Sequence, residues 1–521
     1  MRLRSIGSPR RCPVLSRPPP HFHVAIVGSG FGGIGMAIRM KQEGFRDFVI
    51  LERASDVGGV WRDNSYPGCA CDVQSHLYSF SFAPNPGWSR SFSPQPEIHA
   101  YLRDCADRFG IRPYIRFNHT VREARWDDAR QRWRIETSQG TYTADVFIPA
   151  VGGLSEPSIP ALPGLERFQG KVMHSARWDH GYPLDGKRVA VIGTGASAIQ
   201  FVPAIQPRVG RLLLFQRTAP WVVQRNDRAI GEGARRLFQR MPGLQRLARG
   251  TLYVLRELLA LGFMHPWILR LAQRRALRQL EETIPDPVLR AKLTPNYTMG
   301  CKRVLVSDDY LPALTKPNVE VHTGGIQEVR EHSLVTKDGV EHPVDALIFG
   351  TGFQVTAMPF MHHVYGRDGR SLMESWEGTM KAHLGTSVTG FPNLFMLLGP
   401  NTGLGHTSVI LMMESQIEHV LGALRYLEGR GLAAVEPTPE AQAEFVRQVD
   451  TRMATTVWMQ GGCVSWYQDA TGRVSTLWPG FTFTFRRRVE RFEPSEYVAI
   501  LPHGRRKPAA FPAPSGQMAH A

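Results

Sequence analysis

The sequence predicts an α/β fold with two Rossmann-like dinucleotide-binding domains, one inserted into the other, together with a helical insert. A buried strand, a glycine-rich turn and a helix follow one another twice, from about residues 24 and 188. Two further apolar strands, at 145–148 and 345–348, each lead into a glycine turn. Such strands are expected where the chain crosses between two nucleotide-binding domains, so the second domain should split the first.

The first glycine turn follows the strand at 24–27 and has the pattern Gly28-x-Gly30-x-x-Gly33. The next strand, at 48–51, ends at Glu52, 24 residues after Gly28. The glycines let the backbone approach a pyrophosphate at a helix N-terminus, and the acid would accept hydrogen bonds from ribose hydroxyls. These residues are therefore predicted to bind an adenine dinucleotide, the alternative being a tight turn that binds nothing.

The second glycine turn follows the strand at 188–192 and ends in alanine, as Gly193-x-Gly195-x-x-Ala198. The strand after it ends in Gln216-Arg217 instead of an acid. An arginine at this position can pair with a 2′-phosphate, which an acid would repel, so this site should bind NADPH. The alternative for Arg217 is a solvated surface charge. The residues predicted to bind NADPH here are Gly193, Thr194, Gly195, Ala196, Ser197, Gln216 and Arg217.

Two dinucleotide sites in one chain indicate a nicotinamide cofactor that delivers hydride to a second redox cofactor, for which we expect FAD. The predicted division of the chain is a disordered basic extension (1–20), an FAD-binding domain in two parts (21–155 and 340–485), an NADPH-binding domain (156–339) and a basic C-terminal tail (486–521). Within the NADPH-binding domain a basic insert at about 229–292 lacks strand patterns, and helices are expected there at 233–249, 251–261 and 267–282.

Composition restricts the class of protein. With 42% hydrophobic residues, the bulk of the 521-residue chain is not intrinsically disordered. The formal net charge of +16 indicates a polyanionic partner, but the excess is concentrated, with +5 in 1–20, +8 in 225–292 and +4 in 486–521. No nucleic-acid recognition motif accompanies the arginines, so nucleic acid is not expected as a partner. The insert is interpreted either as a basic amphipathic surface for an anionic membrane or as helices packed on the core with a solvated face.

The six cysteines include no CxxC pair, so neither a zinc site nor a disulfide framework is expected, and no metal ligands are assigned. This cysteine usage favours a reducing cytosol. No apolar run reaches the roughly 18 residues that cross a bilayer. The expected location is therefore cytoplasmic, with peripheral membrane contact through residues 225–292 left open.

The segment 168–179 carries the resemblance to a known family. Its pattern resembles the FxGxxxHxxxW(P/D) fingerprint of Baeyer–Villiger monooxygenases, a class B group of flavin-containing monooxygenases, and the resemblance extends over about 21–485. The matching residues are Phe168, Gly170, His174 and Trp178. Related N- and S-oxidising enzymes have Tyr or Phe where this chain has Trp178. The resemblance implies that the fingerprint links domain motion with catalysis. On the residues alone, a single histidine such as His174 is more often structural.

The segment 58–72 resembles the flavin-lining GG(T)W…N-x-YPG…D stretch of that family, with Val60 where threonine is commoner. The resemblance implies that Val60, Trp61, Asp72 and Tyr78 contact FAD, and that Ala70 and Cys71 lie near the nicotinamide cofactor. Val121, after an expected strand at 111–117, matches the position whose backbone holds the adenine.

The resemblance also implies the reaction. A C4a-peroxyflavin attacks a ketone, inserts one oxygen atom of O2 beside the carbonyl and gives an ester or lactone. Arg303 matches the fixed cation of this chemistry, held by Asp72; an arginine is suitable because it cannot lose its proton. Lys302 matches a lysine for the 2′-phosphate, and Trp458 resembles a tryptophan that bonds the nicotinamide ribose.

Two alternatives stay open from the sequence. The same machinery could oxygenate amines or sulfides, against which Trp178 and Arg303 argue as the sole activity. A non-catalytic protein that senses NADPH is the other alternative. The sequence specifies neither the physiological ketone or sulfide nor the oligomeric state, because substrate pockets of this kind have no spacing signature.

Overall fold

Two sheets with the same internal strand order organise the chain. In the computed structural model, which describes residues 18–504, the first sheet has the order β17-β4-β5-β6-β1-β2-β3 and the second has β12-β9-β8-β16-β7. In both, the strand that leads into a glycine turn lies between two parallel neighbours: β1 pairs with β2 and β6, and β8 pairs with β9 and β16. This repeat confirms the predicted pair of Rossmann-like units.

Within the first sheet, β4, β5 and β6 form an antiparallel meander. The strands of this sheet are β1 (His21–Val27), β2 (Phe48–Leu51), β3 (Ile115–Arg116), β4 (Val121–Asp127), β5 (Arg132–Thr137), β6 (Gly140–Pro149) and β17 (Val364–Tyr365). The prediction of a strand at 111–117 is wrong over most of its length. Arg112–Tyr114 forms the 3₁₀ turn η1, and only Ile115 and Arg116 pair with β2.

The second sheet is entirely parallel, and its strands are β7 (Lys171–His174), β8 (Arg188–Ile192), β9 (Arg211–Phe215), β12 (Val319–His322) and β16 (Ala346–Phe349). Three small sheets complete the described strands: β13 (Ile326–Val329) with β14 (Ser333–Thr336) and β15 (Glu341–Pro343); β10 (Val222–Val223) with β11 (Leu305–Val306); and β18 (Ala434–Pro437) with β19 (Tyr497–Ile500).

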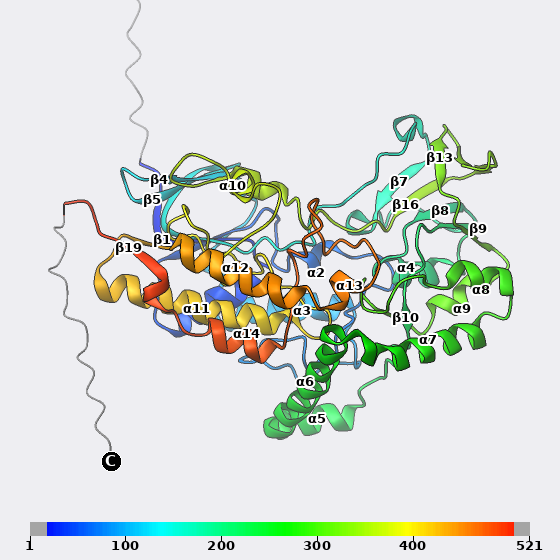
Figure 1. Cartoon of the computed structure of the whole chain (residues 1–521), viewed down its shortest axis with the longest axis horizontal. Helices are drawn as coiled ribbons and strands as arrows, with labels where there is room; N and C mark the ends of the chain where they lie inside the picture. Colours follow the sequence, from blue (N-terminus) through cyan, green and yellow to red (C-terminus); the bar gives the residue numbers. More distant parts are fainter. Residues whose placement is uncertain (1–17, 505–521) are drawn as a thin grey trace, which may run out of the picture.

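The chain crosses twice between two lobes, one built on each sheet (Figure 1). It leaves the first lobe after β6 and returns after β16, so the second lobe is an insertion into the first. The helices of the first lobe are α1 (Phe31–Gln42), α2 (Val60–Asp63), α3 (Gln95–Arg108), α10 (Leu372–Trp376), α11 (Val409–Arg430), α12 (Pro439–Met453), α13 (Val457–Gln460) and α14 (Thr482–Val489); the second lobe has α4 (Ala198–Ile205) and α9 (Tyr310–Leu314).

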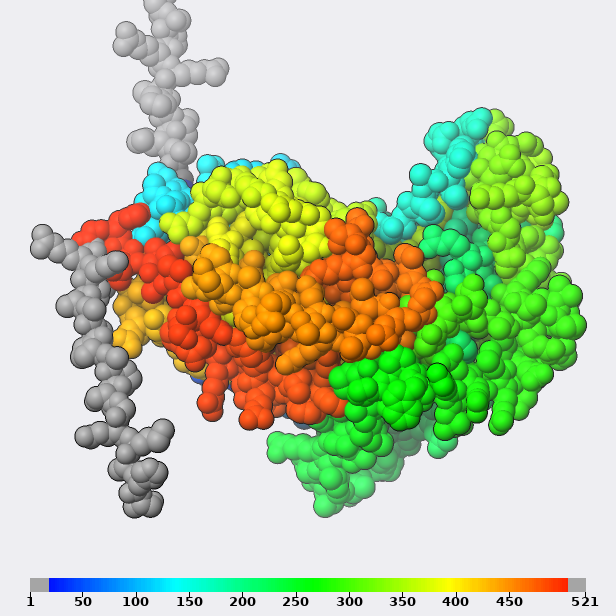
Figure 2. Space-filling model, viewed as in Figure 1, coloured from blue at the N-terminus to red at the C-terminus, as the bar shows by residue number. Residues whose placement is uncertain are grey.

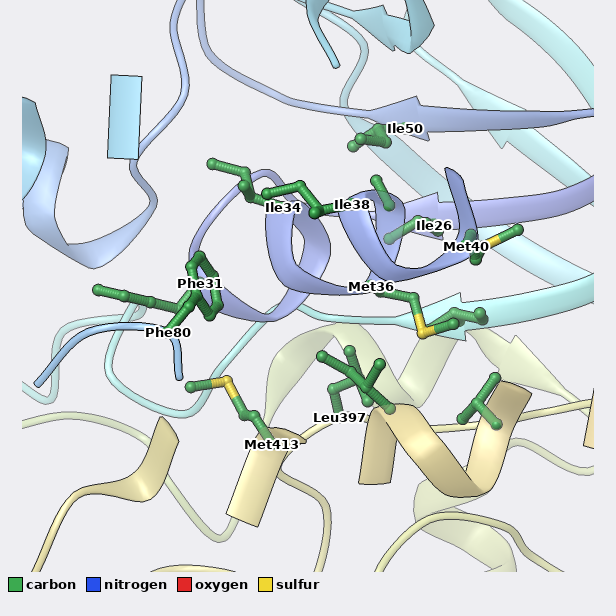
Figure 3. Close-up of a cluster of buried hydrophobic side chains, with 14 of the residues drawn as sticks. Ile26, Phe31, Ile34, Met36, Ile38, Met40, Ile50, Phe80, Leu397 and Met413 are labelled. Atoms are coloured by element: carbon green, nitrogen blue, oxygen red, sulfur yellow. The ribbon is translucent and has the colours of Figure 1, made fainter. Parts of the chain in front are cut away.

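The core of the first lobe surrounds α1. Figure 3 shows Ile34 and Ile38 of this helix near Ile26 and Ile50 of the sheet, whereas Met36 faces the side of Leu397. All but Leu397 of these side chains are fully buried. At Gly35, a Cβ atom would lie 2.8 Å from the ring of Phe80, so a larger residue would separate α1 from its neighbours. This packing fixes the N-terminus of α1, where the first glycine turn ends.

The insert consists of α5 (Glu232–Arg240), α6 (Pro242–Met264), η4 (Pro266–Ile268), α7 (Leu269–Thr283) and α8 (Pro287–Leu293). The helical character was predicted, but the expected break at Gly250 is wrong: α6 runs through it, and the break comes at Met241. Pro242 explains this position, because proline at the first turn of a helix costs no hydrogen bond, whereas it disrupts a helix interior.

The expected C-terminal tail from residue 486 is wrong for residues 486–504. Helix α14 continues to Val489, and β19 pairs with β18 in antiparallel register. Tyr497 is buried, and its hydroxyl lies 2.8 Å from His419 Nε2 and 3.0 Å from Ser387 Oγ. The arginines of this stretch suggested a tail, but the buried aromatic and aliphatic side chains between them hold it to the first lobe. Most of the basic extension expected at 1–20, namely residues 1–17, lies outside the residues that the structure describes. Residues 505–521 of the expected tail also lie outside them.

A substitution of Tyr497 tests whether this C-terminal stretch belongs to the core. Tyr497→Ala should lower the free energy of unfolding by about 3–5 kcal/mol, because it leaves a cavity and two unpaired polar groups. Urea unfolding followed by circular dichroism measures the change. Val498→Ala is the matched control: this side chain is 42% exposed, and its loss should change stability by about 0.5 kcal/mol or less. Equal stability of the two variants would show that β19 contributes nothing to the core.

Candidate active site between the two nucleotide sites

The first glycine turn can adopt its shape only with glycine. Gly28 has φ of +96°, and a Cβ atom there would lie 2.9 Å from the carbonyl oxygen of Ala150. At Gly33 the clash would be 1.9 Å, with the oxygen of Gly28. Gly30 precedes α1, and no side chain caps the first N–H groups of that helix. Free N–H groups at a helix N-terminus attract a pyrophosphate, so the turn fits the predicted dinucleotide.

Glu52 lies at the end of β2 and orders this turn. Its carboxylate accepts hydrogen bonds from the N–H and hydroxyl of Ser29, at 2.8 and 2.7 Å, and from the N–H of Ala54 at 2.9 Å. Arg62 lies 3.1 Å from the second oxygen. The acid is 3% exposed. It is therefore a support for the loop in this structure, and its contact with ribose hydroxyls stays a prediction.

A second glycine pair lies against the first turn. A Cβ atom on Gly59 would lie 3.1 Å from the Cα of Gly30, so the two backbones are in close contact. Gly59 leads into α2, which carries Val60 and Trp61, and the indole N–H of Trp61 donates to the hydroxyl of Tyr78 at 3.1 Å. Burial raises the pKa of the Tyr78 phenol, which keeps it neutral. Three of the residues implied to line the flavin therefore form one connected group beside the first turn.

The second glycine turn repeats the geometry of the first. Gly193 has φ of +101°, and a Cβ atom there would lie 2.5 Å from the carbonyl oxygen of Gly350. Gly350 follows β16 as Ala150 follows β6, so each turn packs against the crossing strand of its own sheet. Gly195 and Ala196 are exposed, with Thr194 and Ser197 half-buried. This loop presents backbone N–H groups before α4, as a pyrophosphate site requires.

Two cations without a carboxylate partner lie beside this turn. Arg217 is exposed and Lys302 is half-buried. Burial lowers the pKa of Lys302, and the charge of Arg217 lowers it further, so the two side chains are close enough to repel. Within residues 18–504, neither forms an ion pair with an acid. Paired cations of this kind fit a 2′-phosphate. Gln216, by contrast, is buried and donates to the Lys292 carbonyl oxygen at 2.6 Å, so it supports the loop.

Arg303 and Asp72 meet between the lobes, as predicted. The Nε of Arg303 donates to Asp72 Oδ2 at 2.7 Å, Nη2 lies 2.6 Å from the same oxygen, and Nη1 donates to the Leu404 carbonyl oxygen at 3.4 Å. The charge of Asp72 raises the pKa of Arg303, which outweighs the opposing effect of burial. Both side chains are 26% exposed. The guanidinium is therefore a permanent, oriented cation that remains accessible.

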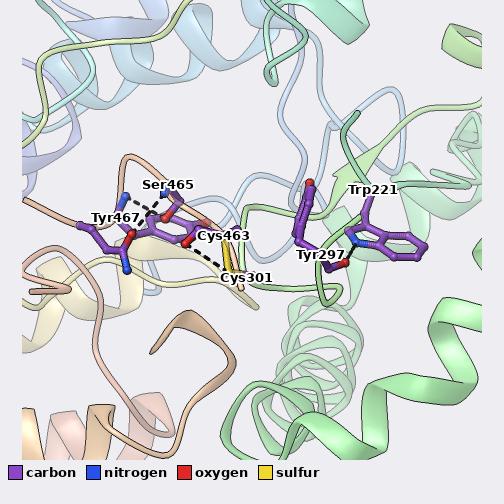
Figure 4. The surroundings of a disulfide bond; sticks show 7 residues. Trp221, Tyr297, Cys301, Cys463, Ser465 and Tyr467 are labelled. Atoms are coloured by element: carbon purple, nitrogen blue, oxygen red, sulfur yellow. Dashed lines mark hydrogen bonds between the residues drawn. A yellow bond between two sulfur atoms is a disulfide. The ribbon is translucent and has the colours of Figure 1, made fainter. Parts of the chain in front are cut away.

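A disulfide joins the Arg303 loop to the C-terminal part of the chain. Cys301 and Cys463 are bonded, across 162 positions of sequence (Figure 4). A disulfide framework was not expected from the sequence, and this single bond was not predicted. The spacing of the two cysteines carried no signal, because only the fold brings them together. On the other side of the loop, the indole N–H of Trp221 donates to the carbonyl oxygen of Tyr297 at 2.9 Å. The loop before Arg303 is thus held on both sides.

Trp458 lies on α13 and stacks on Phe263 of the insert, with ring centroids 5.5 Å apart and planes 18° apart. Its indole nitrogen is buried without a protein partner, and so is the hydroxyl of Tyr467. Burial raises the pKa of the Tyr467 phenol, and the nearby charge of Arg303 opposes this effect, so the hydroxyl lies in the same site as Arg303. Buried donors are normally paired, so two unpaired ones here fit a bound polar group. Sequence reasoning noted the segment containing Tyr467 but did not select that residue.

The segment predicted to approach the nicotinamide cofactor is held between the lobes. Gln200 of α4 donates to the carbonyl oxygen of Ala70 at 2.9 Å and accepts from its N–H at 3.3 Å. The hydroxyl of Tyr66 donates to the same Gln200 at 3.0 Å, and Arg225 donates to the Cys71 carbonyl oxygen at 3.1 Å. A cavity of about 350 Å³, lined in part by Ala70 and Arg225, opens beside this contact. Val121 lies elsewhere in the first lobe, as the first residue of β4.

The fingerprint segment forms the edge strand β7 and the turn after it. His174 pairs in register with Phe349, one residue before the return crossing. Burial lowers the pKa of His174 to about 4, so the ring is neutral at pH 7 and does not act as a charged acid. Gly170 packs against the Asp345 carbonyl oxygen and the ring of Phe168. Trp178 packs on Phe201 of α4. These contacts fit a structural link to the crossing.

One cluster of metal-ligand side chains occurs within the described residues, formed by Glu320, His322 and His342. Arg211 occupies both oxygens of Glu320, at 2.7 and 2.9 Å. The cation competes with a metal for that carboxylate, so we assign no metal site here. The cluster lies at the outer edge of the second sheet, beyond the two nucleotide sites.

Comparison with known proteins identifies the family. A model described as flavin-binding monooxygenase-like matches residues 21–367. A Baeyer–Villiger monooxygenase of Streptomyces coelicolor is 54% identical over 92% of this chain and 93% of its own length, and one of Pseudomonas aeruginosa is 50% identical over 94% of each. The chain belongs to the Baeyer–Villiger monooxygenase family. A solved structure titled oxidized steroid monooxygenase bound to NADP is 30% identical, with a TM-score of 0.82 over 92% of this chain and 100% of that one. The family and the fold class predicted from the sequence are thereby confirmed.

The two cations beside the second turn of this monooxygenase predict its preference between nicotinamide cofactors. Arg217→Ala should raise the KM for NADPH about tenfold, because charge-assisted hydrogen bonds to a phosphate are lost. The KM for NADH should change less than twofold, roughly, since NADH lacks that phosphate. Steady-state kinetics with both cofactors measures the two values. Arg208→Ala is the matched control, because Arg208 is exposed and paired with Asp185. Parallel increases in both KM values would remove Arg217 from the 2′-phosphate site.

Proposed function

We propose that this Baeyer–Villiger monooxygenase uses NADPH and FAD to insert one oxygen atom of O2 beside a ketone carbonyl, giving an ester or lactone. The observation that carries the proposal is the oriented cation Arg303, fixed by Asp72 between the two nucleotide sites. The oxygen chemistry, including the C4a-peroxyflavin expected from the family resemblance, is supplied by the flavin when it is bound. The protein provides orientation and charge.

Arg303 would stabilise negative charge first on the attacking nucleophile and then on the oxyanion that its attack creates. A ketone attacked by an anionic nucleophile becomes a tetrahedral oxyanion, and a preorganised cation lowers the free energy of that state more than the free energy of the ketone. Asp72 fixes the guanidinium and raises its pKa, so the charge does not vary with pH in the working range. Asp72 thus positions the cation.

The remaining residues of the site would bind and orient the cofactors. The turns at Gly28 and Gly193 fit the two pyrophosphates, and Trp61 with Tyr78 lies where the flavin is expected. The buried indole N–H of Trp458 has no protein partner and would donate to the nicotinamide ribose. The fingerprint, with neutral His174 beside the return crossing, would transmit movement between the lobes.

Variants of Arg303 test whether its charge stabilises the oxyanion. Arg303→Ala should reduce the rate of ester formation by about 10²–10³-fold, because a charge aimed at the developing oxyanion is lost. Anaerobic reduction of the flavin by NADPH should survive, with the consumed NADPH diverted to hydrogen peroxide under air. Arg303→Lys, which keeps the charge without the planar fork, should retain an intermediate rate. Ester formation at the normal rate in Arg303→Ala would refute the assignment.

A competition assay separates this proposal from oxygenation of amines or sulfides. The enzyme receives a ketone and a sulfide together, and mass spectrometry identifies the products. Ester or lactone formation supports the proposal. A sulfoxide as the sole product, with the ketone unchanged across a panel of linear and cyclic substrates, would favour the alternative.

A further inference from the structure

Helix α6 presents apolar side chains to solvent. The exposed ones recur at helical spacing along one face, and several have more than half of their surface accessible: Leu247 66%, Val254 56%, Leu255 56% and Leu258 55%. Leu244 and Leu259 extend the same stripe. Single exposed leucines are ordinary on a protein surface, but a continuous stripe on one helix indicates an interaction surface.

The opposite face of α6 is polar and is bonded to the protein. Arg249 donates to the His76 carbonyl oxygen at 2.7 Å, and Arg256 donates to Gln74 Oε1 at 2.7 Å. Glu257, which is buried, accepts from the hydroxyl of Thr482 at 2.6 Å. These contacts fix the rotation of the helix about its axis. The apolar stripe therefore faces outward because the polar face is already hydrogen-bonded to the first lobe.

The flanking helices extend this surface. On η4 and α7, Trp267 is 68% and Leu271 77% exposed; on α5 and just after it, Leu237 is 45% and Met241 51% exposed. Figure 1 places α5 and α6 at the lower edge of the molecule, and Figure 2 shows this part of the chain protruding there in green. We call the exposed apolar side chains of α5, α6, η4 and α7 the docking surface.

Arginines surround the docking surface. Between residues 235 and 280 the chain has ten arginines and one acid, the buried Glu257. Seven of these arginines are exposed: Arg236, Arg240, Arg246, Arg270, Arg274, Arg275 and Arg278. Of these seven, Arg236 pairs with Glu232 at 2.8 Å, just outside this stretch. An apolar face bordered by an excess of cations fits a surface that is apolar at depth and anionic at its edge, which is the arrangement of an anionic bilayer. A second copy of the chain fits poorly, because a two-fold contact would bring the same arginines together.

We propose that the docking surface binds the headgroup region of an anionic membrane, with α6 lying in the plane of the bilayer. Within residues 18–504 no single helix has both the length and the apolar character to cross a membrane; only Pro242–Met264 and Pro266–Thr283 together do, bent by 109°. The bonded polar face of α6 opposes crossing, because insertion would strip Arg249 and Glu257 of their partners. The apolar face would instead enter about 5–10 Å into the interface. This inference does not depend on the proposed reaction.

Vesicle sedimentation of the full-length, FAD-loaded protein tests the proposal. The probes are vesicles of phosphatidylcholine alone and of phosphatidylcholine with one third phosphatidylglycerol. The wild type should sediment with the anionic vesicles and at least tenfold less with the neutral ones, and its binding should weaken as salt rises. Equal sedimentation with both, or with neither, would overturn the proposal.

Paired variants separate the apolar and electrostatic contributions. Leu255→Ser with Leu258→Ser should lower the partition coefficient on anionic vesicles at least tenfold. Arg270→Gln with Arg274→Gln should lower it about fivefold for each arginine, following the typical contribution of one cation near a charged surface. The matched control is Val340→Ser with Val498→Ser, which alters side chains that are 49% and 42% exposed elsewhere. Unchanged binding in the leucine variant would contradict the docking surface.

Two further measurements keep the result decisive. Flavin absorbance and thermal unfolding establish that each variant is folded and loaded, so a loss of sedimentation reports on binding. Analytical ultracentrifugation without lipid detects self-association. A wild-type dimer that dissociates in the leucine variant, together with no sedimentation on anionic vesicles, would assign the surface to a second copy and refute the membrane.

Discussion

The arrangement of the proposed active site depends on the ion pair between Arg303 and Asp72. Asp72 belongs to a loop of the first lobe, and Arg303 follows the insert of the second, so the pair forms only when the lobes are correctly placed. Both side chains keep a quarter of their surface exposed, and such pairs add little net stability. The main effect is geometric: two nitrogens of the guanidinium contact the same carboxylate oxygen, and a third faces a backbone carbonyl oxygen.

Two neighbouring contacts restrain the same region. The disulfide from Cys301 to Cys463 holds the loop before Arg303 to the C-terminal segment that carries Trp458 and Tyr467. Gln200 holds the chain just before Asp72 to the second lobe. The cation is thus fixed relative to both lobes, although neither lobe alone contains the site. A reaction that needs charge at a defined point benefits from this, because reorganisation would otherwise add to the barrier.

Local sequence patterns predicted those features of the fold that depend only on neighbouring residues. Sequence patterns located the two glycine turns, their flanking strands and the crossing strands, because strand, turn and helix are contiguous in each unit. A Cβ atom at Gly28, Gly33 or Gly193 would clash with the backbone of the same unit, so glycine is required there. The roles of Arg303 and Asp72 came from family resemblance, and the structure brings these two residues together. The disulfide and Tyr467 could not be found in this way, since their partners are distant in sequence. Residues 486–504 were misassigned because their arginines masked the apolar positions that anchor them.

Helix α6 shows why periodicity alone does not orient a helix. An amphipathic pattern specifies two faces, and the apolar one is normally assigned to the core. Here the arginines and the glutamate of the polar face find partners on the first lobe, and that set of hydrogen bonds decides the orientation. The one large aromatic side chain that α6 buries, Phe263, lies at its C-terminal end and stacks on Trp458 of the active site. The same helix therefore connects the proposed membrane surface with the proposed nicotinamide site, through the stacking of Phe263 on Trp458.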